Sequence, residues 1–300
     1  MRKSALIIPY FGQWPEWMDL YLYSLSKNPS LNVIFYTDIP TDSLTTLPQN
    51  AKFHKISFAE YCKNASDKLG VEFAPDNPYK LCDLKPFYPI IHKDEMATYE
   101  YVGWGDIDLL YGNLDIFFPD SLMDKYEIIS THCYIFSGHF TLIKNKDNVC
   151  QRVFNIPNWK ELLTKKENCS IDEIMLTRAL VPKLNYLRNK FWKLGRGEYD
   201  KLKIRILVAV SKILYPKYHL RELWTTPKRI DGKTFFWHSG EVYDEKGLKL
   251  PYIHFLFFKK TIYNPTNLDY WKDGFYKVEV DKLNQESTIL IDKFGIKIYD

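Results

Sequence analysis

Two aspartates, Asp106 and Asp108, interrupt an apolar stretch that reads EYVGWGDIDLLYGNL over residues 100–114. Carboxylates are rarely buried unless they pair with a cation, so this pair predicts a metal or another cationic partner. In an ideal strand, side chains two residues apart share a face at about 6.6 Å, too wide for both to bind one small ion. Either the chain bends here, or Asp108 binds a metal while Asp106 binds a ribose hydroxyl or a metal-bound water. Capping of the following helix is the alternative for both.

The ends of the first two predicted strands carry residues suited to a nucleotide. Pro9, Tyr10 and Phe11 end the first strand and could pack against a base, although an ordinary strand end explains them equally well. Asp38 ends the second strand, where a carboxylate suits a base or a ribose, as in doubly wound nucleotide-binding folds. Helix capping is the alternative for Asp38.

Three charged residues, Lys80, Asp83 and Lys85, lie close together in the segment PYKLCDLKP. Lysines can offset phosphate charge, and an aspartate can accept a hydrogen bond from a sugar hydroxyl. All three are therefore candidates for binding a ligand with phosphate and sugar hydroxyl groups, such as a nucleotide sugar, with a solvated helix face as the alternative.

The segment SGHF predicts a tight turn or a bulge that faces a ligand. Gly138 lets a ligand come close, while Ser137 and His139 offer hydrogen bonds. His139 is equally compatible with a histidine in the core.

Two adjacent acids, Asp172 and Glu173, occur in the segment CSIDEIML. Ser170 and Glu173 match the S-x-x-E capping box, which would give Glu173 a structural task. Asp172 is therefore the stronger candidate for chemistry.

The composition indicates one large α/β unit or a domain with an extension. The chain has 300 residues, 46% of them hydrophobic, and a net charge of +4, too small to indicate a nucleic-acid partner. Five widely spaced cysteines without a CxxC pair indicate reduced thiols, and we expect a cytoplasmic protein. No apolar run approaches the roughly 20 residues that span a membrane.

Strands and helices alternate through about residue 145, which predicts a mostly parallel, doubly wound sheet. The predicted strands cover 4–11, 31–38, 51–58, 100–114, 126–130, 136–145 and 250–260, with a hairpin over 233–247 and further strands within 276–300. The predicted helices cover 14–28, 58–70, 78–96, 158–166, 170–187 and 199–221. The last of these is basic and suits either packing on the sheet or contact with anionic lipid.

Five segments in this order resemble a family of bacterial glycosyltransferases with the GT-A fold that act in capsular or lipopolysaccharide synthesis. The segments are IIPYFGQWPEW, IFYTD, PYKLCDLKP, GWGDIDLLYGNL and SGHFTLIKN. The resemblance covers roughly residues 5–180, and YIHFLFFKK shows a weaker similarity. It implies a GT-A-like, Rossmann-related sheet, a nucleotide-sugar donor such as a UDP-sugar, and a divalent metal, Mn²⁺ or Mg²⁺.

The same resemblance implies roles for individual residues. Asp106 and Asp108 match the D-x-D motif of metal-dependent members, and His254 matches a late histidine that serves as a third metal ligand. The alternative for His254 is a core residue, because a lone histidine in an apolar strand is more often buried in the core. Asp172 and Glu173 resemble an acidic pair that faces the donor sugar. Lys259 follows His254 and could hold the diphosphate, and the SGHF segment lies near the donor sugar or the acceptor.

The expected function is therefore transfer of a sugar to a saccharide or lipid-linked acceptor, with retention favoured over inversion. Residues 1–195 would form the nucleotide-sugar-binding catalytic core, and residues 196–300 a helical and β extension that completes the active site. Peripheral contact with the inner face of a membrane is expected from the basic helix. A metal-dependent phosphohydrolase and a non-catalytic carbohydrate-binding module are the alternatives.

Overall fold

The first strand is buried on both faces, which places it at the centre of a sheet. Ala5 and Ile7 of β1 (Ser4–Pro9) belong to one hydrophobic cluster, and Leu6 and Ile8 belong to another. Because side chains alternate along a strand, the two clusters lie on opposite faces of the sheet. The computed structural model describes residues 1–193, 200–221, 234–254, 278–284, 287–292 and 295–299.

The main sheet has seven strands in the order β3-β2-β1-β4-β7-β6-β8. Strands β3, β2, β1 and β4 are parallel, β7 runs antiparallel to both of its neighbours, and β8 is parallel to β6. This arrangement confirms the prediction of an α/β fold with a mostly parallel sheet. The other strands are β2 (Leu31–Thr37), β3 (Ala51–Lys55), β4 (Tyr101–Gly105), β6 (Ile128–Ser130), β7 (Phe140–Lys144) and β8 (Tyr218–Leu220).

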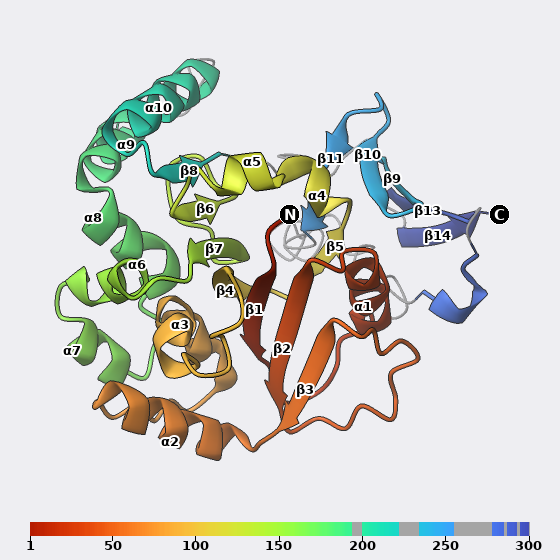
Figure 1. Cartoon of the computed structure of the whole chain (residues 1–300), viewed down its shortest axis with the longest axis horizontal. Coiled ribbons are helices and arrows are strands. Elements are labelled where there is room, and N and C mark those ends of the chain that lie inside the picture. Colours follow the sequence, from red (N-terminus) through yellow and green to blue (C-terminus); the bar gives the residue numbers. More distant parts are fainter. Residues whose placement is uncertain (194–199, 222–233, 255–277, 285–286, 293–294, 300) are drawn as a thin grey trace.

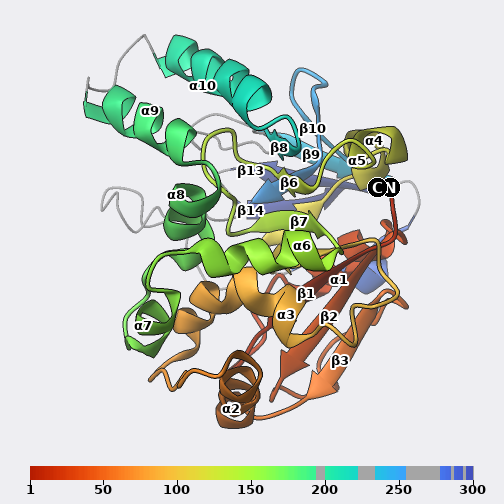
Figure 2. The ribbon, with the colours of Figure 1, turned by 60° about the vertical axis from the view of Figure 1, so that its left-hand side comes forward.

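Helices cover both faces of this sheet (Figures 1 and 2). Helices α2 and α3 pack on one face, and α1 packs on the other, between the main sheet and a second sheet. The helices are α1 (Met18–Ser26), α2 (Phe58–Leu69), α3 (Tyr88–Ile91), α4 (Leu114–Phe117), α5 (Asp120–Met123), α6 (Asp147–Cys150), α7 (Trp159–Thr164), α8 (Leu176–Leu180), α9 (Pro182–Lys193) and α10 (Asp200–Leu214). In the part of the chain that the structure describes, every helix is too short or too polar to cross a bilayer.

The second sheet is antiparallel, with the order β11-β10-β9-β13-β14. It contains the predicted hairpin and two of the predicted C-terminal strands, so the C-terminal β extension is confirmed. A separate pair joins β5 to β12 in antiparallel register. These strands are β5 (Leu109–Tyr111), β9 (Phe235–His238), β10 (Glu241–Asp244), β11 (Lys249–Leu250), β12 (Tyr252–His254), β13 (Thr288–Asp292) and β14 (Gly295–Tyr299).

Three predicted elements are divided in the structure. The expected helix over 78–96 is a 3-10 helix (Pro78–Phe87) followed by the short α3, because Pro86 and Pro89 withhold the backbone donors that a long α-helix needs. The expected strand over 100–114 breaks after β4 and resumes as β5 in another sheet. The expected helix over 170–187 consists of a π-helical turn, α8 and α9, with Pro182 at the last junction.

The prediction that the helix beginning at residue 199 continues to residue 221 is wrong. Helix α10 ends at Leu214, and the chain then forms β8 at the edge of the main sheet. Pro216 follows closely and disfavours helix in the residue before it. The main sheet contains residues from both sides of the expected domain boundary at residue 195, because β8 lies beyond it. The boundary itself stays a prediction.

Gly103 lies in β4 where the backbone of β7 comes very close. A Cβ atom at this position would sit 1.9 Å from the carbonyl oxygen of Thr141, whereas one at Gly105 would meet its nearest atom, the flexible side chain of Leu6, at 3.0 Å. We expect Gly103→Ala to lower the free energy of unfolding by about 3 kcal/mol and Gly105→Ala to cost clearly less, measured by urea unfolding. Equal costs for the two variants would contradict the close pairing of β4 with β7.

Candidate active site

A cavity of about 560 Å³ lies where β1 and β4 end. Polar and aromatic side chains from distant parts of the chain line it. The predicted site residues among them are Pro9, Tyr10, Phe11, Lys85, Asp106, Asp108, Gly138, His139, Asp172, Glu173 and His254. The cavity thus brings together most of the residues that the sequence singles out.

The chain bends between Asp106 and Asp108, as the spacing argument requires. Strand β4 ends at Gly105, and β5 begins at Leu109 and pairs with β12 rather than with the main sheet. The register places His254 opposite Leu109, so the imidazole comes beside Asp108, with His254 Nε2 lying 3.4 Å from Asp108 Oδ1.

Asp106, Asp108 and His254 form a group that could hold one metal ion. One ligand atom from each residue can be chosen so that all three lie within 4.8 Å of one another. Ligands of one divalent ion lie about 2.0–2.6 Å from it, so this spacing is compatible with a shared ion. Two carboxylates with an imidazole suit a borderline ion such as Mn²⁺ as well as other divalent metals, so the donor set does not identify the ion.

The ammonium group of Lys85 connects this group to the rest of the cavity. Its Nζ lies 2.6 Å from Asp106 Oδ1 and 3.7 Å from Asp172 Oδ2, and it donates to the carbonyl oxygen of Gly138 at 2.9 Å. Burial works to lower the pKa of Lys85, but the neighbouring carboxylates more than offset this effect and raise the pKa well above its usual value. Lys85 therefore supplies a fixed positive charge inside the cavity.

Asp172 and Glu173 both face the cavity, but not through the expected capping box. Ser170 adopts a left-handed conformation and its side chain forms no cap, while Glu173 Oε1 accepts a hydrogen bond from the Gly138 N–H at 3.3 Å. Burial raises the pKa of Asp172 to about 7, against the opposing effect of Lys85. Burial also raises the pKa of Glu173. Asp172 is therefore suited to hold or accept a proton near neutral pH.

Within the segment SGHF, two of the three predicted residues reach the cavity. A Cβ atom on Gly138 would sit 2.7 Å from Asp172 Oδ2, so only glycine fits without displacing the acids. The His139 ring stacks on His254 with 4.3 Å between centroids, and burial holds its pKa well below the usual range. Ser137 is fully buried away from the cavity, where its carbonyl oxygen accepts from Trp104 Nε1.

The 3-10 helix that follows residue 77 separates its charged residues onto two faces. Such a helix has three residues per turn, so Tyr79, Cys82 and Lys85 share the face that lines the cavity. Lys80 and Asp83 fall on another face, where they are 1% and 0% exposed. The prediction that Lys80 and Asp83 bind the nucleotide sugar is therefore corrected, and so is the alternative of a solvated face.

Lys80 and Asp83 instead form a buried ion pair that holds the segment leading to Asp172. Lys80 Nζ lies 2.8 Å from Asp83 Oδ2 and donates to the carbonyl oxygen of Glu167 at 2.7 Å. Asp83 accepts from the backbone N–H groups of Cys169 and Ile171 at 2.7 and 2.8 Å. The pair thus positions the start of the π-helical turn rather than a ligand.

The remaining predicted residues differ in their placement. Tyr10 lines the cavity and stacks on Trp14, with 5.6 Å between ring centroids. Asp38 is exposed, does not line the cavity, and accepts from the Gly12 N–H at 3.2 Å. Lys259 lies outside the described residues. The cavity also contains residues that the sequence reading missed, namely Trp17, Tyr79, Cys82, Asn168 and Ser170.

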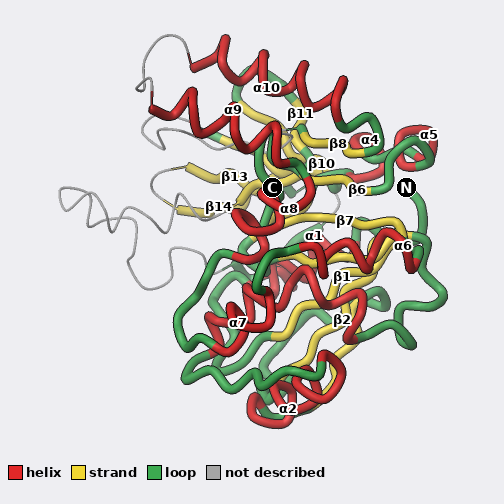
Figure 3. The backbone as a smooth tube through the Cα atoms, turned by 90° about the vertical axis from the view of Figure 1, so that its left-hand side faces the viewer, coloured by secondary structure: helices red, strands yellow, loops and turns green. Residues whose placement is uncertain are grey.

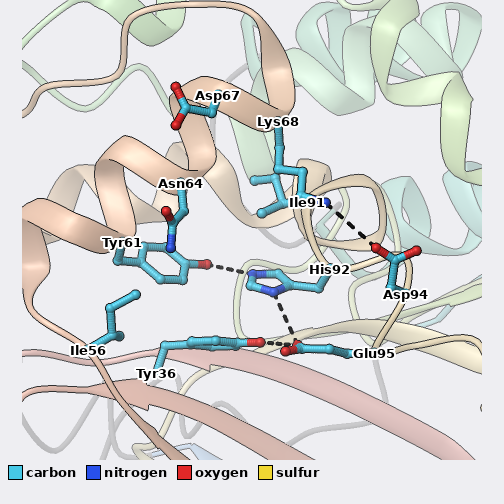
Figure 4. Close-up of a pocket in the computed structure, with 10 residues that line it drawn as sticks. All are labelled: Tyr36, Ile56, Tyr61, Asn64, Asp67, Lys68, Ile91, His92, Asp94 and Glu95. Carbon is cyan, nitrogen blue, oxygen red and sulfur yellow. Dashed lines mark hydrogen bonds and ion pairs between the residues drawn. The ribbon is translucent and has the colours of Figure 1, made fainter.

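A second cavity, of about 540 Å³, lies between α2 and the turn after α3 (Figure 4). The Tyr61 hydroxyl lies 2.9 Å from His92 Nε2, His92 Nδ1 lies 3.4 Å from Glu95, and the Tyr36 hydroxyl also donates to Glu95. The hydrogen bond from His92 lowers the pKa of Glu95 to about 2. Because these polar groups bond to one another, we do not take this cavity as the candidate active site.

The buried pair allows a direct test of its structural role. We expect Lys80→Met to lower the free energy of unfolding by about 3–5 kcal/mol, because it leaves the Asp83 carboxylate buried without its cation. Lys63→Met is the matched control, since Lys63 forms an exposed pair with Asp67 at 3.8 Å, and such pairs contribute less than about 1 kcal/mol. Similar costs for the two variants in urea unfolding would contradict the assignment.

The raised pKa of Asp172 makes stability depend on pH. Its pKa is about 7 in the folded protein and near 3.8 otherwise, so the folded state binds this proton more tightly. The stabilisation from the neutral carboxyl is present at low pH and is lost as the pH rises through this range. We expect the stability of Asp172→Asn relative to the wild type to increase between about pH 4 and pH 7 in urea unfolding. A difference that is constant with pH would contradict the raised pKa.

Comparisons with known proteins give a family but no activity. No curated protein matches the sequence. The solved structure of the glycosyltransferase GlyE from Streptococcus pneumoniae TIGR4 is weakly similar, with a TM-score of 0.35 and 14% identity. The match covers 77% of this chain and 57% of that chain. The model of a family of unknown function, DUF6625, matches residues 6–271, and the chain therefore belongs to this family.

Proposed function

We propose that the protein is a metal-dependent glycosyltransferase that moves a sugar from a nucleotide-sugar donor, a UDP-sugar, to a saccharide or lipid-linked acceptor. The observation that carries this proposal is the convergence of Asp106, Asp108 and His254 with Lys85 and Asp172 in one cavity. A divalent metal, Mn²⁺ or Mg²⁺, fits the first three residues. The chemistry it would supply when bound is Lewis-acid stabilisation of a diphosphate leaving group.

The chain's own residues cover the other requirements of such a transfer. The bond between the sugar C1 and the diphosphate oxygen breaks, the electron pair leaves with the nucleoside diphosphate, and C1 bonds to the acceptor oxygen. Lys85 places a positive charge in the cavity where negative charge grows on the leaving group. All four of Tyr10, Phe11, Gly138 and Glu173 line the cavity. In this proposal Tyr10 and Phe11 offer aromatic surface to the base, and Gly138 and Glu173 bind the donor sugar.

The acceptor proton has two routes. In retention, which the sequence resemblance favours, the departing diphosphate takes the proton. In inversion, a carboxylate such as Asp172 takes it, and the pKa of about 7 suits Asp172 to that task. The anomeric configuration of the product, measured by NMR, distinguishes the two routes.

Two other functions use the same residues. A phosphohydrolase would release phosphate without an acceptor, but such enzymes commonly hold two metals, and the described residues form one candidate metal group. A sugar-binding module would bind donor without turnover. The cytoplasmic location remains a prediction.

The proposal is tested by incubating purified protein with Mn²⁺ and a panel of UDP- and GDP-sugars, and measuring released nucleoside diphosphate. We expect release that requires Mn²⁺ and falls by about 100-fold or more in Asp108→Ala, because losing several kcal/mol of transition-state stabilisation has that effect. The exposed Asp67→Ala on α2 is the matched control and should retain full release.

A metal titration adds a measurement that does not depend on turnover. Mn²⁺ binding followed by electron paramagnetic resonance should weaken in both Asp108→Ala and His254→Ala, and stay unchanged in Asp67→Ala. Release of inorganic phosphate would favour the hydrolase, and donor binding without turnover would favour the binding module. Mn²⁺ binding that is unchanged in both site variants would overturn the metal assignment.

A further inference from the structure

Among the described residues, helix α10 has buried side chains on one side and exposed aliphatic side chains on the opposite side. Leu207 and Ser211 are buried on the inner side. On the outer side, Leu202, Ile206 and Ile213 are 54%, 39% and 77% exposed. We call these three residues, together with the exposed Ala209, the aliphatic stripe, defined as Leu202, Ile206, Ala209 and Ile213. Their spacing of four, three and four residues places them along one face of the helix.

Basic side chains accompany this stripe. Arg205 and Lys212 are exposed on α10 within the span of the stripe. On the neighbouring α9, Lys183, Lys190 and Lys193 are exposed at positions that recur along one helical face. We call these three lysines the lysine row; the Nζ atom of Lys190 also lies 4.9 Å from the ring centroid of the exposed Tyr186.

The two helices concentrate the positive charge of the chain. Together, α9 and α10 carry eight basic residues and one acidic residue, a net charge of +7. The whole chain carries +4, so the residues outside these two helices carry a net charge of −3. The basic residues are Lys183, Arg188, Lys190, Lys193, Lys201, Lys203, Arg205 and Lys212, and the acidic residue is Asp200. Such segregation indicates an anionic partner for this end of the molecule.

The two helices lie side by side at the periphery of the molecule. They pack against each other, and the views in Figures 1, 2 and 3 all place them beyond α8, away from the β1–β4 part of the main sheet. Soluble proteins rarely leave aliphatic side chains in a row on an outer surface unless something covers them. A partner that contacts both features must be apolar toward the aliphatic stripe and negatively charged toward the basic residues.

We propose that α9 and α10 bind the surface of an anionic lipid bilayer. An interfacial helix inserts its apolar side chains among the lipids, while flanking lysines and arginines contact acidic headgroups. A nucleic acid or an anionic polysaccharide would match the charge, but it offers no apolar layer to the aliphatic stripe. This inference does not depend on the proposed reaction, because it rests on residues outside the cavity.

Vesicle co-sedimentation tests the proposal with the full chain. The protein is mixed with vesicles of phosphatidylcholine alone and of phosphatidylcholine with phosphatidylglycerol, at low and high salt. We expect binding to the anionic vesicles that high salt weakens. Each basic residue near an anionic surface contributes about 1 kcal/mol, so Lys183→Gln/Lys190→Gln/Lys193→Gln should weaken binding by roughly 100-fold.

A second variant tests the aliphatic stripe. Leu202→Ser/Ile206→Ser/Ile213→Ser should weaken binding by about tenfold or more, because these side chains would no longer leave water. The matched control is Leu47→Ser/Leu248→Ser, which replaces leucines that are 57% and 62% exposed elsewhere, and it should bind like the wild type. Circular dichroism and thermal unfolding establish that each variant is folded.

Three outcomes would overturn the proposal. Equal sedimentation with neutral and anionic vesicles, or with neither, would exclude an anionic bilayer as the partner. If the serine variant binds anionic vesicles as well as the wild type does, the aliphatic stripe does not contribute and charge alone explains the binding. Binding to heparin would then identify a soluble polyanion as the partner. A dimer by light scattering that the serine variant dissociates would instead assign the aliphatic stripe to a second copy of the chain.

Discussion

The cavity depends on the attraction between the buried Lys85 ammonium and the carboxylates around it. Four acidic side chains, Asp106, Asp172, Asp108 and Glu173, line this cavity, and without a cation their mutual repulsion would oppose folding. The Lys85 ammonium lies close to Asp106 and Asp172 and donates a hydrogen bond to the carbonyl oxygen of Gly138. It therefore ties the end of β4, the turn before β7 and the π-helical turn into one arrangement.

Much of the fold follows from the order of apolar segments. The alternation that predicts a parallel sheet holds for β1 to β4, and the hairpin of β9 and β10 follows from its turn residues. The edge strand β8 could not be anticipated, because its three residues continue a helical pattern without an apolar signal of their own. The π-helical turn at Asp172 is similarly hidden, since its sequence matches the capping box of an ordinary helix.

The site could be predicted in part, and the failures have one physical cause. Asp106, Asp108 and Lys85 were identifiable because charge in an apolar context needs a partner. Lys80 and Asp83 carry the same signal, but their partners are each other and the backbone of the segment that follows Leu162. The period of three residues in the 3-10 helix is the signal that places Tyr79 and Cys82 with Lys85 and sets the buried pair on another face.

The pairing of β5 with β12 has a consequence for how the protein matures. Asp108 and His254 lie 146 positions apart, so the loop between them must close before the imidazole reaches the carboxylate. Contacts between distant residues form late, because their chain entropy must be given up first. When only the first two hundred residues have left the ribosome, Asp106 and Asp108 are present but His254 is not. The candidate metal group is thus complete only once the chain has been made as far as His254.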